Sequence, residues 1–262
     1  MFIFSPFHID LGIDLGTANT IIYAKKRGFI CNEASYIALN QDNKTVAIGN
    51  CAKEMMGKTP FSIKVIRPLA DGVISDFEAG EAFIKGLIKR ANIPRIRIGR
   101  VVMGVPTQAS EVEKAAMIDS ALLAGAKKVY LITEPMAAAI GLNKDIMGGS
   151  ANMIVDIGGG TTDIAVINYG GIVVDNTIRT AGDDLDQAIA TYINQKYRIK
   201  IGLVTAERLK TKLINLSETT ETDVFIFKLV FDSCRYTKFE KPCQSRDIAI
   251  HSKWCSAYKI RE

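Results

Sequence analysis

Two short segments of this chain combine an aspartate, glycine and hydroxyl side chains in the same order. The first is Asp14-Leu15-Gly16-Thr17-Ala18-Asn19, and the second is Asp156-Ile157-Gly158-Gly159-Gly160-Thr161-Thr162. Glycine lets a backbone approach a ligand closely, and successive amides can form a nest for an anion. The side chains that add donors are Thr17, Asn19, Thr161 and Thr162. Both segments therefore have the composition of a phosphate-binding turn.

The aspartate that opens each segment, Asp14 or Asp156, indicates a metal ion. A carboxylate beside bare phosphate would be repelled, because both groups are negative. The same carboxylate is useful where Mg2+ lies between the two groups, held largely through water as this cation prefers. Two aspartates in matched positions therefore predict a phosphate chain bound together with Mg2+.

Other phosphate-binding motifs do not fit. No G-x-x-x-x-G-K-[ST] pattern occurs in the sequence. Each turn is followed by a predicted strand, whereas a dinucleotide fingerprint leads into a helix. A single turn of this kind would indicate only a tight hairpin. We favour phosphate binding because two matched turns occur.

Glu134 stands before Pro135 at the start of a predicted helix. The rigid proline and the helix N-terminus, which favours negative charge, would fix its carboxylate. A carboxylate fixed in this way could orient a water molecule for attack on a terminal phosphate. The alternative is an ordinary carboxylate at a helix start.

Matched strands must position the two turns. Apolar residues occupy the odd positions of residues 9–15, which predicts a strand with Asp10 and Asp14 on one face. A strand, a turn and a second strand are predicted over residues 9–24 and again over 153–168. This internal repeat predicts a duplicated domain whose two turns face each other across a ligand.

Helix signals separate and follow these units. Ser110 and Glu113 fit a capping box, and the helix they open is predicted to run to about Ala124, where Gly125 can end it. Pro135 suits the first position of another helix, predicted over 136–142. The other predicted helices span 77–91, 184–196 and 205–213, and the other predicted strands span 100–105 and 129–133.

Composition excludes several classes of protein. The 262 residues are 48% hydrophobic and 23% charged, as in globular proteins, and a net charge of +5 is too small to indicate nucleic acid. Five cysteines without a C-x-x-C pair argue against disulfides or zinc and favour a reducing cytoplasm. No stretch approaches the ~20 apolar residues that cross a bilayer, and the apolar N-terminus lacks the features of a signal peptide.

One stretch is rich in basic residues and has no acid among them: Lys85, Lys89, Arg90, Arg95, Arg97 and Arg100. Such a patch favours anionic lipid headgroups. Together with the apolar N-terminus, it predicts peripheral attachment to a membrane. The alternative is a solvated basic face.

Three ordered motifs resemble those of MreB, a family of bacterial actin relatives. Residues 13–20 are similar to its first phosphate motif, residues 133–141 to its connecting motif, and residues 155–162 to its second phosphate motif. The resemblance covers about residues 9–213 and includes the segments 66–74 and 205–210.

The resemblance implies an α/β, actin-like (ribonuclease H-like) duplicated fold, with two half-domains around a nucleotide cleft. It implies ATP with Mg2+, slow hydrolysis, and self-assembly into filaments at the inner face of the cell membrane. The implied partners are further copies of the chain and proteins of cell-wall synthesis and cell shape, with no role for nucleic acid.

The site residues follow by position from the same resemblance. Asp14 and Asp156 would organise Mg2+ and its waters, and Glu134 would position the hydrolytic water. Glu207 and Lys210 would approach the ribose and adenine, although a solvated surface ion pair is the alternative. The residues expected to contact the cofactor are Asp14, Gly16, Thr17, Ala18, Asn19, Asp156, Gly158, Gly159, Gly160, Thr161, Thr162, Glu207, Arg208, Leu209 and Lys210.

The expected organisation is an actin-like half I over residues 1–145, with a small subdomain inserted at about 31–70, and the start of half II over 146–213. We expect a divergent tail over 214–262, a truncated second half and weakened nucleotide binding, because no second glycine-rich loop for the adenine is found. Two alternatives to a filament-forming ATPase stay open: a divergent chain with impaired ATP binding, and a phosphotransferase of the same fold.

Overall fold

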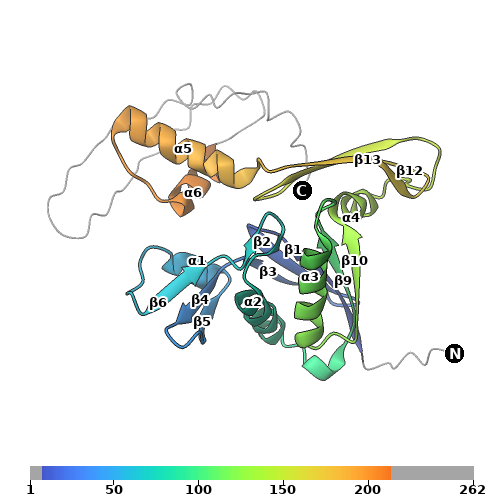
Figure 1. The fold of residues 1–262 in the computed structure, drawn as a ribbon, viewed down its shortest axis with the longest axis horizontal. Helices are drawn as coiled ribbons and strands as arrows, with labels where there is room; N and C mark the ends of the chain where they lie inside the picture. The colour runs from blue at the N-terminus through green and yellow to red at the C-terminus, as the bar shows by residue number, and fades with distance from the viewer. Residues whose placement is uncertain (1–7, 214–262) are drawn as a thin grey trace.

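The computed structural model describes residues 8–213, which form four sheets and six α-helices (Figure 1). The apolar N-terminus and the tail that we expected to diverge lie outside the described residues. None of the helices between residues 8 and 213 has the length and apolar character needed to span a bilayer.

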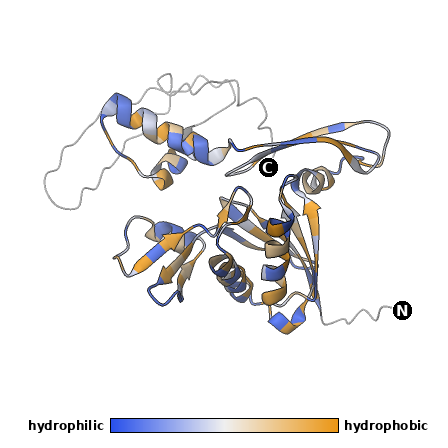
Figure 2. Cartoon of the chain, viewed as in Figure 1, coloured by the Kyte–Doolittle hydropathy of each residue, from blue (hydrophilic) through white to orange (hydrophobic). Residues whose placement is uncertain are grey.

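The large sheet carries the first predicted hairpin at its centre. Its strands, in order of pairing, are β10 (Lys128–Thr133), β9 (Ile98–Val105), β1 (Ile9–Leu15), β2 (Asn19–Ala24) and β3 (Gly28–Ala34). Strand β1 runs parallel to β9 and antiparallel to β2. The alternation predicted for β1 is confirmed, because Leu11, Ile13 and Leu15 are buried. Figure 2 shows hydrophobic residues concentrated on the strands of this sheet.

Helices α2 (Phe77–Arg90) and α3 (Glu111–Leu123) pack on the large sheet, where Phe83 and Met117 join the core of β1 and β9 (Figure 1). The predicted capping box is present at the start of α3: the Ser110 hydroxyl accepts a hydrogen bond from the Glu113 amide, and the Glu113 carboxylate accepts one from the Ser110 amide. Gly125 has a φ of +113°, which suits the predicted end of this helix.

A small subdomain follows β3. It contains helix α1 (Asn50–Met55) and a sheet of β5 (Thr45–Ile48), β4 (Ile37–Asn40) and β6 (Ile63–Ile66). We expected this insertion to begin at about residue 31. Residues 28–34 form β3 of the large sheet instead, because they pair with β2 along its whole length.

The second half begins with helix α4 (Glu134–Gly141) and an antiparallel sheet of β11 (Asn152–Ile157), β12 (Thr162–Asn168) and β13 (Gly171–Ile178). The alanine run of α4 packs closely on this sheet, since Ala139 is buried beside Ile154 and Ala165. Helices α5 (Gly182–Tyr197) and α6 (Leu203–Leu213) pack on each other through a separate apolar cluster. The predicted repeat of two hairpins, β1–β2 and β11–β12, is therefore confirmed.

Candidate functional site

The turns that follow β1 and β11 lie directly against each other. A Cβ atom added to Gly159 would come within 2.9 Å of the Ala18 Cβ, and one added to Gly160 would come within 3.1 Å of the Thr17 hydroxyl. No larger residue at these two positions could keep this approach without a shift of the backbone or its neighbour. The structure therefore brings the two predicted turns face to face.

The first turn is fixed from the side of the large sheet. The Ser35 hydroxyl donates to the Gly16 carbonyl at 2.6 Å, and the Ser35 amide donates to the Ala18 carbonyl at 3.0 Å. The hydroxyls of Thr20 and Ser35, both fully buried, bond to each other at 2.9 Å. Asn19 stays exposed at the end of the turn. Ser35, directly after β3, therefore holds the carbonyls of Gly16 and Ala18.

A third turn, which the sequence did not assign to the site, meets both of the others. It joins the short strands β7 (Leu69–Ala70) and β8 (Val73–Ile74). The Gly72 amide donates to the Thr17 hydroxyl oxygen at 2.8 Å, and the Asp71 amide would lie 3.1 Å from a Cβ on Gly160. The Asp-Gly pair is the sequence signal for a turn here, but no local pattern shows what it touches.

The second turn is tied to the start of α5. The Gly182 amide donates to the Gly158 carbonyl at 3.1 Å, and the Asp183 amide donates to the Gly159 carbonyl at 2.8 Å. The Gly158 amide is used within the turn, since it donates to the Thr161 carbonyl at 2.8 Å. A shift of α5 would therefore move the second turn as well.

The two threonines of the second turn are both buried. The Thr162 hydroxyl donates to the Thr180 carbonyl at 2.8 Å, so its hydrogen is committed within the protein. Thr161 is 6% exposed. The structure thus places Thr162 as a support for the turn and leaves the phosphate role of both residues as a prediction.

Carboxylates from both halves gather beside the turns. Burial, followed by the charges of Asp14, Asp163 and Asp156, raises the pKa of Glu134 from 4.5 to about 8. Burial and the charge of Asp156 also raise the pKa of Asp14, although solvent still reaches its side chain. The pKa of Asp156 is raised by burial and by Asp163. Asp14, Asp156 and Glu134 thus lie within electrostatic range of one another, and their roles at a metal ion or phosphate stay predictions.

Asp163 belongs to this cluster, and sequence reasoning treated it only as the beginning of a strand. Its side chain is 1% exposed, and it pairs directly with Asp156 across β11 and β12. Its carboxylate accepts hydrogen bonds from the Thr177 hydroxyl at 2.6 Å and from the Thr107 hydroxyl at 3.3 Å. Thr107 follows β9, so Asp163 links the two halves. An aspartate in an otherwise apolar strand was the available signal.

The cluster suits a hydrated Mg2+ better than an ion held by protein alone. Within residues 8–213, no three His, Cys, Asp or Glu side chains lie close enough to hold a metal ion directly. Burial, and then a neighbouring aspartate, raise the pKa of Asp14 and of Asp156, so their ionised forms are disfavoured here. A divalent cation would offset this cost. Mg2+ keeps several waters and takes one or two carboxylates together with phosphate.

Helix α6 carries the residues expected near the ribose and adenine. Lys210 donates to the Gly182 carbonyl at 2.7 Å and lies 2.9 Å from the Asp186 carboxylate, so it reaches the start of α5 beside the second turn. Glu207 binds Lys53 and is 21% exposed, which differs from a solvated surface pair. Arg208 is exposed. The Leu209 side chain packs between α5 and α6, so it serves the core and is not available to a ligand.

Comparison with known proteins agrees with this geometry. The family model described as MreB/Mbl protein matches residues 8–228, which extends past residue 213, where we expected the resemblance to end. The cell shape-determining protein Mbl of Bacillus subtilis is 46% identical over 209 residues, which cover 79% of this chain and 63% of that protein. The chain thus spans less than two thirds of the length of this relative.

Solved structures share the fold. The crystal structure of MreB 5 of Spiroplasma citri bound to AMPPNP superposes with a TM-score of 0.78 at 35% identity, covering 84% of this chain and 67% of the other. A MamK double helical filament superposes with a TM-score of 0.69 at 26% identity, covering 84% and 70%. The fold of this chain is therefore actin-like, as expected.

Proposed function

Because this chain belongs to the MreB/Mbl family, we propose that it is an actin-like, ATP-binding cytoskeletal protein that forms filaments and directs cell-wall synthesis and rod shape. The observation that carries the proposal is the contact of two glycine turns, each preceded by an aspartate, from opposite halves of the chain. The AMPPNP in the MreB 5 structure and the filament formed by MamK support it.

In this proposal the ATP phosphates are held by the turn of Thr17, Ala18 and Asn19 and by the turn of residues 158–160. Asp14 and Asp156 hold Mg2+ through water, and Glu207 and Lys210 face the nucleoside. A bound Mg2+ would supply positive charge that offsets the phosphates and the carboxylates. The hydrogen bonds from Ser35, Gly72 and the start of α5 hold the two turns in place.

Glu134 is the proposed base for water attack on the terminal phosphate. It accepts a proton only as a carboxylate, and its pKa of about 8 keeps it protonated at neutral pH while the site holds no cation. Positive charge near Asp14 and Asp156 lowers that pKa. We therefore expect slow hydrolysis that begins only when ATP and Mg2+ occupy the site.

Light scattering tests the proposal. Adding ATP and Mg2+ to the purified chain is expected to raise the scattered intensity, and chelating Mg2+ beforehand is expected to prevent the rise. Asp14→Asn should abolish the response. Asp10→Asn is the matched control, because Asp10 lies on the same face of β1 but pairs with Arg100. A response equal with and without nucleotide would contradict the proposal, and ADP release that depends on a sugar would favour a phosphotransferase.

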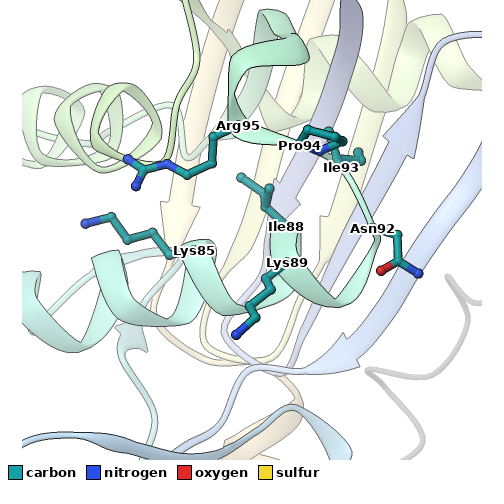
Figure 3. Close-up of a pocket in the computed structure, with 7 residues that line it drawn as sticks. All are labelled: Lys85, Ile88, Lys89, Asn92, Ile93, Pro94 and Arg95. Carbon is teal, nitrogen blue, oxygen red and sulfur yellow. The ribbon is translucent and has the colours of Figure 1, made fainter.

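We also propose that the chain acts at the inner face of the cell membrane, through the basic stretch at the end of α2. An open pocket of about 480 Å³ lies there, lined by Lys85, Ile88, Lys89, Asn92, Ile93, Pro94 and Arg95 (Figure 3). Lys85 and Arg95 extend to the same side of it (Figure 3). Beside the pocket, Ile96 is 82% exposed. Cationic and apolar groups side by side suit a lipid headgroup region.

The structure reduces the number of basic residues whose charge is available to a membrane. Arg100 pairs with Asp10 at 2.5 Å, Arg90 with Glu33 at 3.3 Å, and Lys85 with Glu81 on the same helix. These pairs reduce the charge that three of the six basic residues offer to a membrane. Lys89, Arg95 and Arg97 have no ion pair within the part of the chain that the structure describes. The Arg95 guanidinium donates to the Leu123 carbonyl, so Lys89 and Arg97 carry most of the proposed attraction.

Co-sedimentation with vesicles tests the membrane surface. The variant Lys89→Glu/Arg97→Glu is expected to lose at least about 10-fold in affinity for anionic vesicles, since each basic residue contributes about 1 kcal/mol near such a surface. Lys44→Glu, at a lysine whose side chain is 77% exposed on the small subdomain, should bind like the wild type. Equal loss in both variants, or binding that ignores the lipid charge, would contradict this surface.

A further inference from the structure

Two ion pairs connect the first half to helices α5 and α6. The Lys53 ammonium on α1 lies 2.7 Å from one oxygen of the Glu207 carboxylate and 2.6 Å from the other. Arg67, which follows β6, pairs with the Asp183 carboxylate in the first turn of α5. We call these two pairs the clasp. In each pair the two partners are more than 100 positions apart in the chain.

The clasp is organised around one buried ring. The side chain of Tyr36 is 4% exposed, and its ring centroid lies 4.9 Å from the Arg67 guanidinium and 5.9 Å from the Lys53 ammonium. Cations at this distance from a ring are attracted to its face. Tyr36 therefore holds both cations in place, which reduces the entropy they lose when they meet the acids.

Both acids of the clasp stand next to the nucleotide site. The amide of Asp183 donates to the Gly159 carbonyl of the second turn at 2.8 Å. Glu207 lies one helical turn before Lys210, which donates to the Gly182 carbonyl at 2.7 Å. A movement of the small subdomain is therefore transmitted to the second turn through α5 and to the proposed nucleoside contacts through α6.

The small subdomain contacts helices α5 and α6 through the polar groups of the clasp, whereas the core of each part is apolar. The small subdomain packs around Tyr36, Ala38 and Ala52, while α5 and α6 pack around Ile189 and Leu209 in a separate cluster. The clasp can therefore open without exposing either core. Its ion pairs also remain partly open to solvent, so dissolved salt can weaken them.

We propose that Lys53 and Arg67 are positioning residues that keep the two halves closed over a bound nucleotide and so determine how fast it leaves. This inference rests on the proposed function, because it requires a nucleotide between the turns. Lys53 and Arg67 act on the ligand through Glu207 and Asp183 and do not contact the phosphates. Opening the clasp separates the second turn from the first while both halves stay folded.

Stopped-flow release of a fluorescent ATP analogue, chased with excess ATP in Mg2+, tests the clasp. Lys53→Met and Arg67→Met keep the apolar stem of each side chain, and each is expected to speed release by about 5-fold or more, the lower range of coupling between sites. Lys58→Met is the matched control, because Lys58 is exposed in the same subdomain and lies outside the clasp. The release rate of the wild type should rise with salt, and that of Lys53→Met/Arg67→Met should rise less.

A charge exchange separates positioning from general destabilisation. Arg67→Asp should speed release, and adding Asp183→Arg to it should restore most of the wild-type rate, which a merely unstable variant would not do. If the wild type binds the analogue and both Met variants release it at the wild-type rate, the proposed role of the clasp is wrong. The proposed nucleotide site would be unaffected by that result. A wild type that binds no nucleotide would overturn the proposed function and the clasp together.

Discussion

The Glu134→Gln variant is expected to hydrolyse ATP about 10²-fold more slowly than the wild type, with little change in affinity for ATP. Glutamine keeps the size of the side chain but has no carboxylate to accept a proton from water. The geometry supports this expectation, because Glu134 stands at the start of α4 beside carboxylates from both halves. Burial, followed by the charges of these carboxylates, raises its pKa to about 8. Phosphate release after a single loading of ATP measures the effect.

The matched control is Glu113→Gln, which changes a carboxylate engaged in the capping box of α3. It should hydrolyse ATP at the wild-type rate. An unchanged rate in Glu134→Gln would show that this residue does not orient the water.

The same Glu134→Gln variant has a second signature in the nucleotide-free protein. The pKa of Glu134 is raised from 4.5 to about 8 on folding, so the folded state holds this proton more tightly than the unfolded state. Its contribution to stability is therefore full below the lower value and is lost as the pH rises through the upper one. The wild-type free energy of unfolding should fall by up to about 5 kcal/mol across this window, and Glu134→Gln should show a smaller fall.

Replacing Gly159 with valine is expected to weaken ATP binding by about 10- to 100-fold, or about 1.4–2.7 kcal/mol. A Cβ at this position would stand 2.9 Å from the Ala18 Cβ, so the two turns would have to separate. Titration of a fluorescent ATP analogue in Mg2+ measures the loss. The effect is large because both turns must contact one phosphate chain at the same time.

Gly202→Val controls for the general cost of adding a side chain. A Cβ at Gly202 would meet no atom within 4 Å, so this variant should bind the analogue like the wild type. Equal affinity in Gly159→Val and the wild type would mean that the close approach of the turns has no part in binding.

The local elements of the site could be predicted from the sequence because their signals are local. The alternating apolar residues of β1, the spacing of Ser110 and Glu113, and Pro135 all act within one strand or one helical turn. The repeat of an aspartate before a glycine turn then predicted that the two turns face each other. Each of these features is present in the structure.

The contacts between distant segments could not be predicted, because no local pattern states which surfaces meet. The Asp71-Gly72 turn touches Thr17 only because β7 and β8 bring it there. The pairing of Lys53 with Glu207 joins residues that are 154 positions apart. Strand β13 has little of the apolar alternation that marks a half-buried strand, since four consecutive residues of it are exposed.

Leu209 was predicted to contact the cofactor because of its place in a motif, but its side chain lies in the core. Its position between Glu207 and Lys210 placed it among the expected cofactor contacts, but the helical period turns its side chain toward Ile189 and Ile193. Residues of one motif thus divide between the site and the core according to the face of the helix on which they lie.

A structure of this chain with Mg2+ and a non-hydrolysable ATP analogue would show whether one nucleotide lies between the two turns. We expect one analogue, with its phosphates between residues 16–19 and 158–160 and with the metal ion on the side of Asp14 and Asp156. Phosphates that contact only one of the two turns, or an analogue bound elsewhere on the chain, would contradict the account.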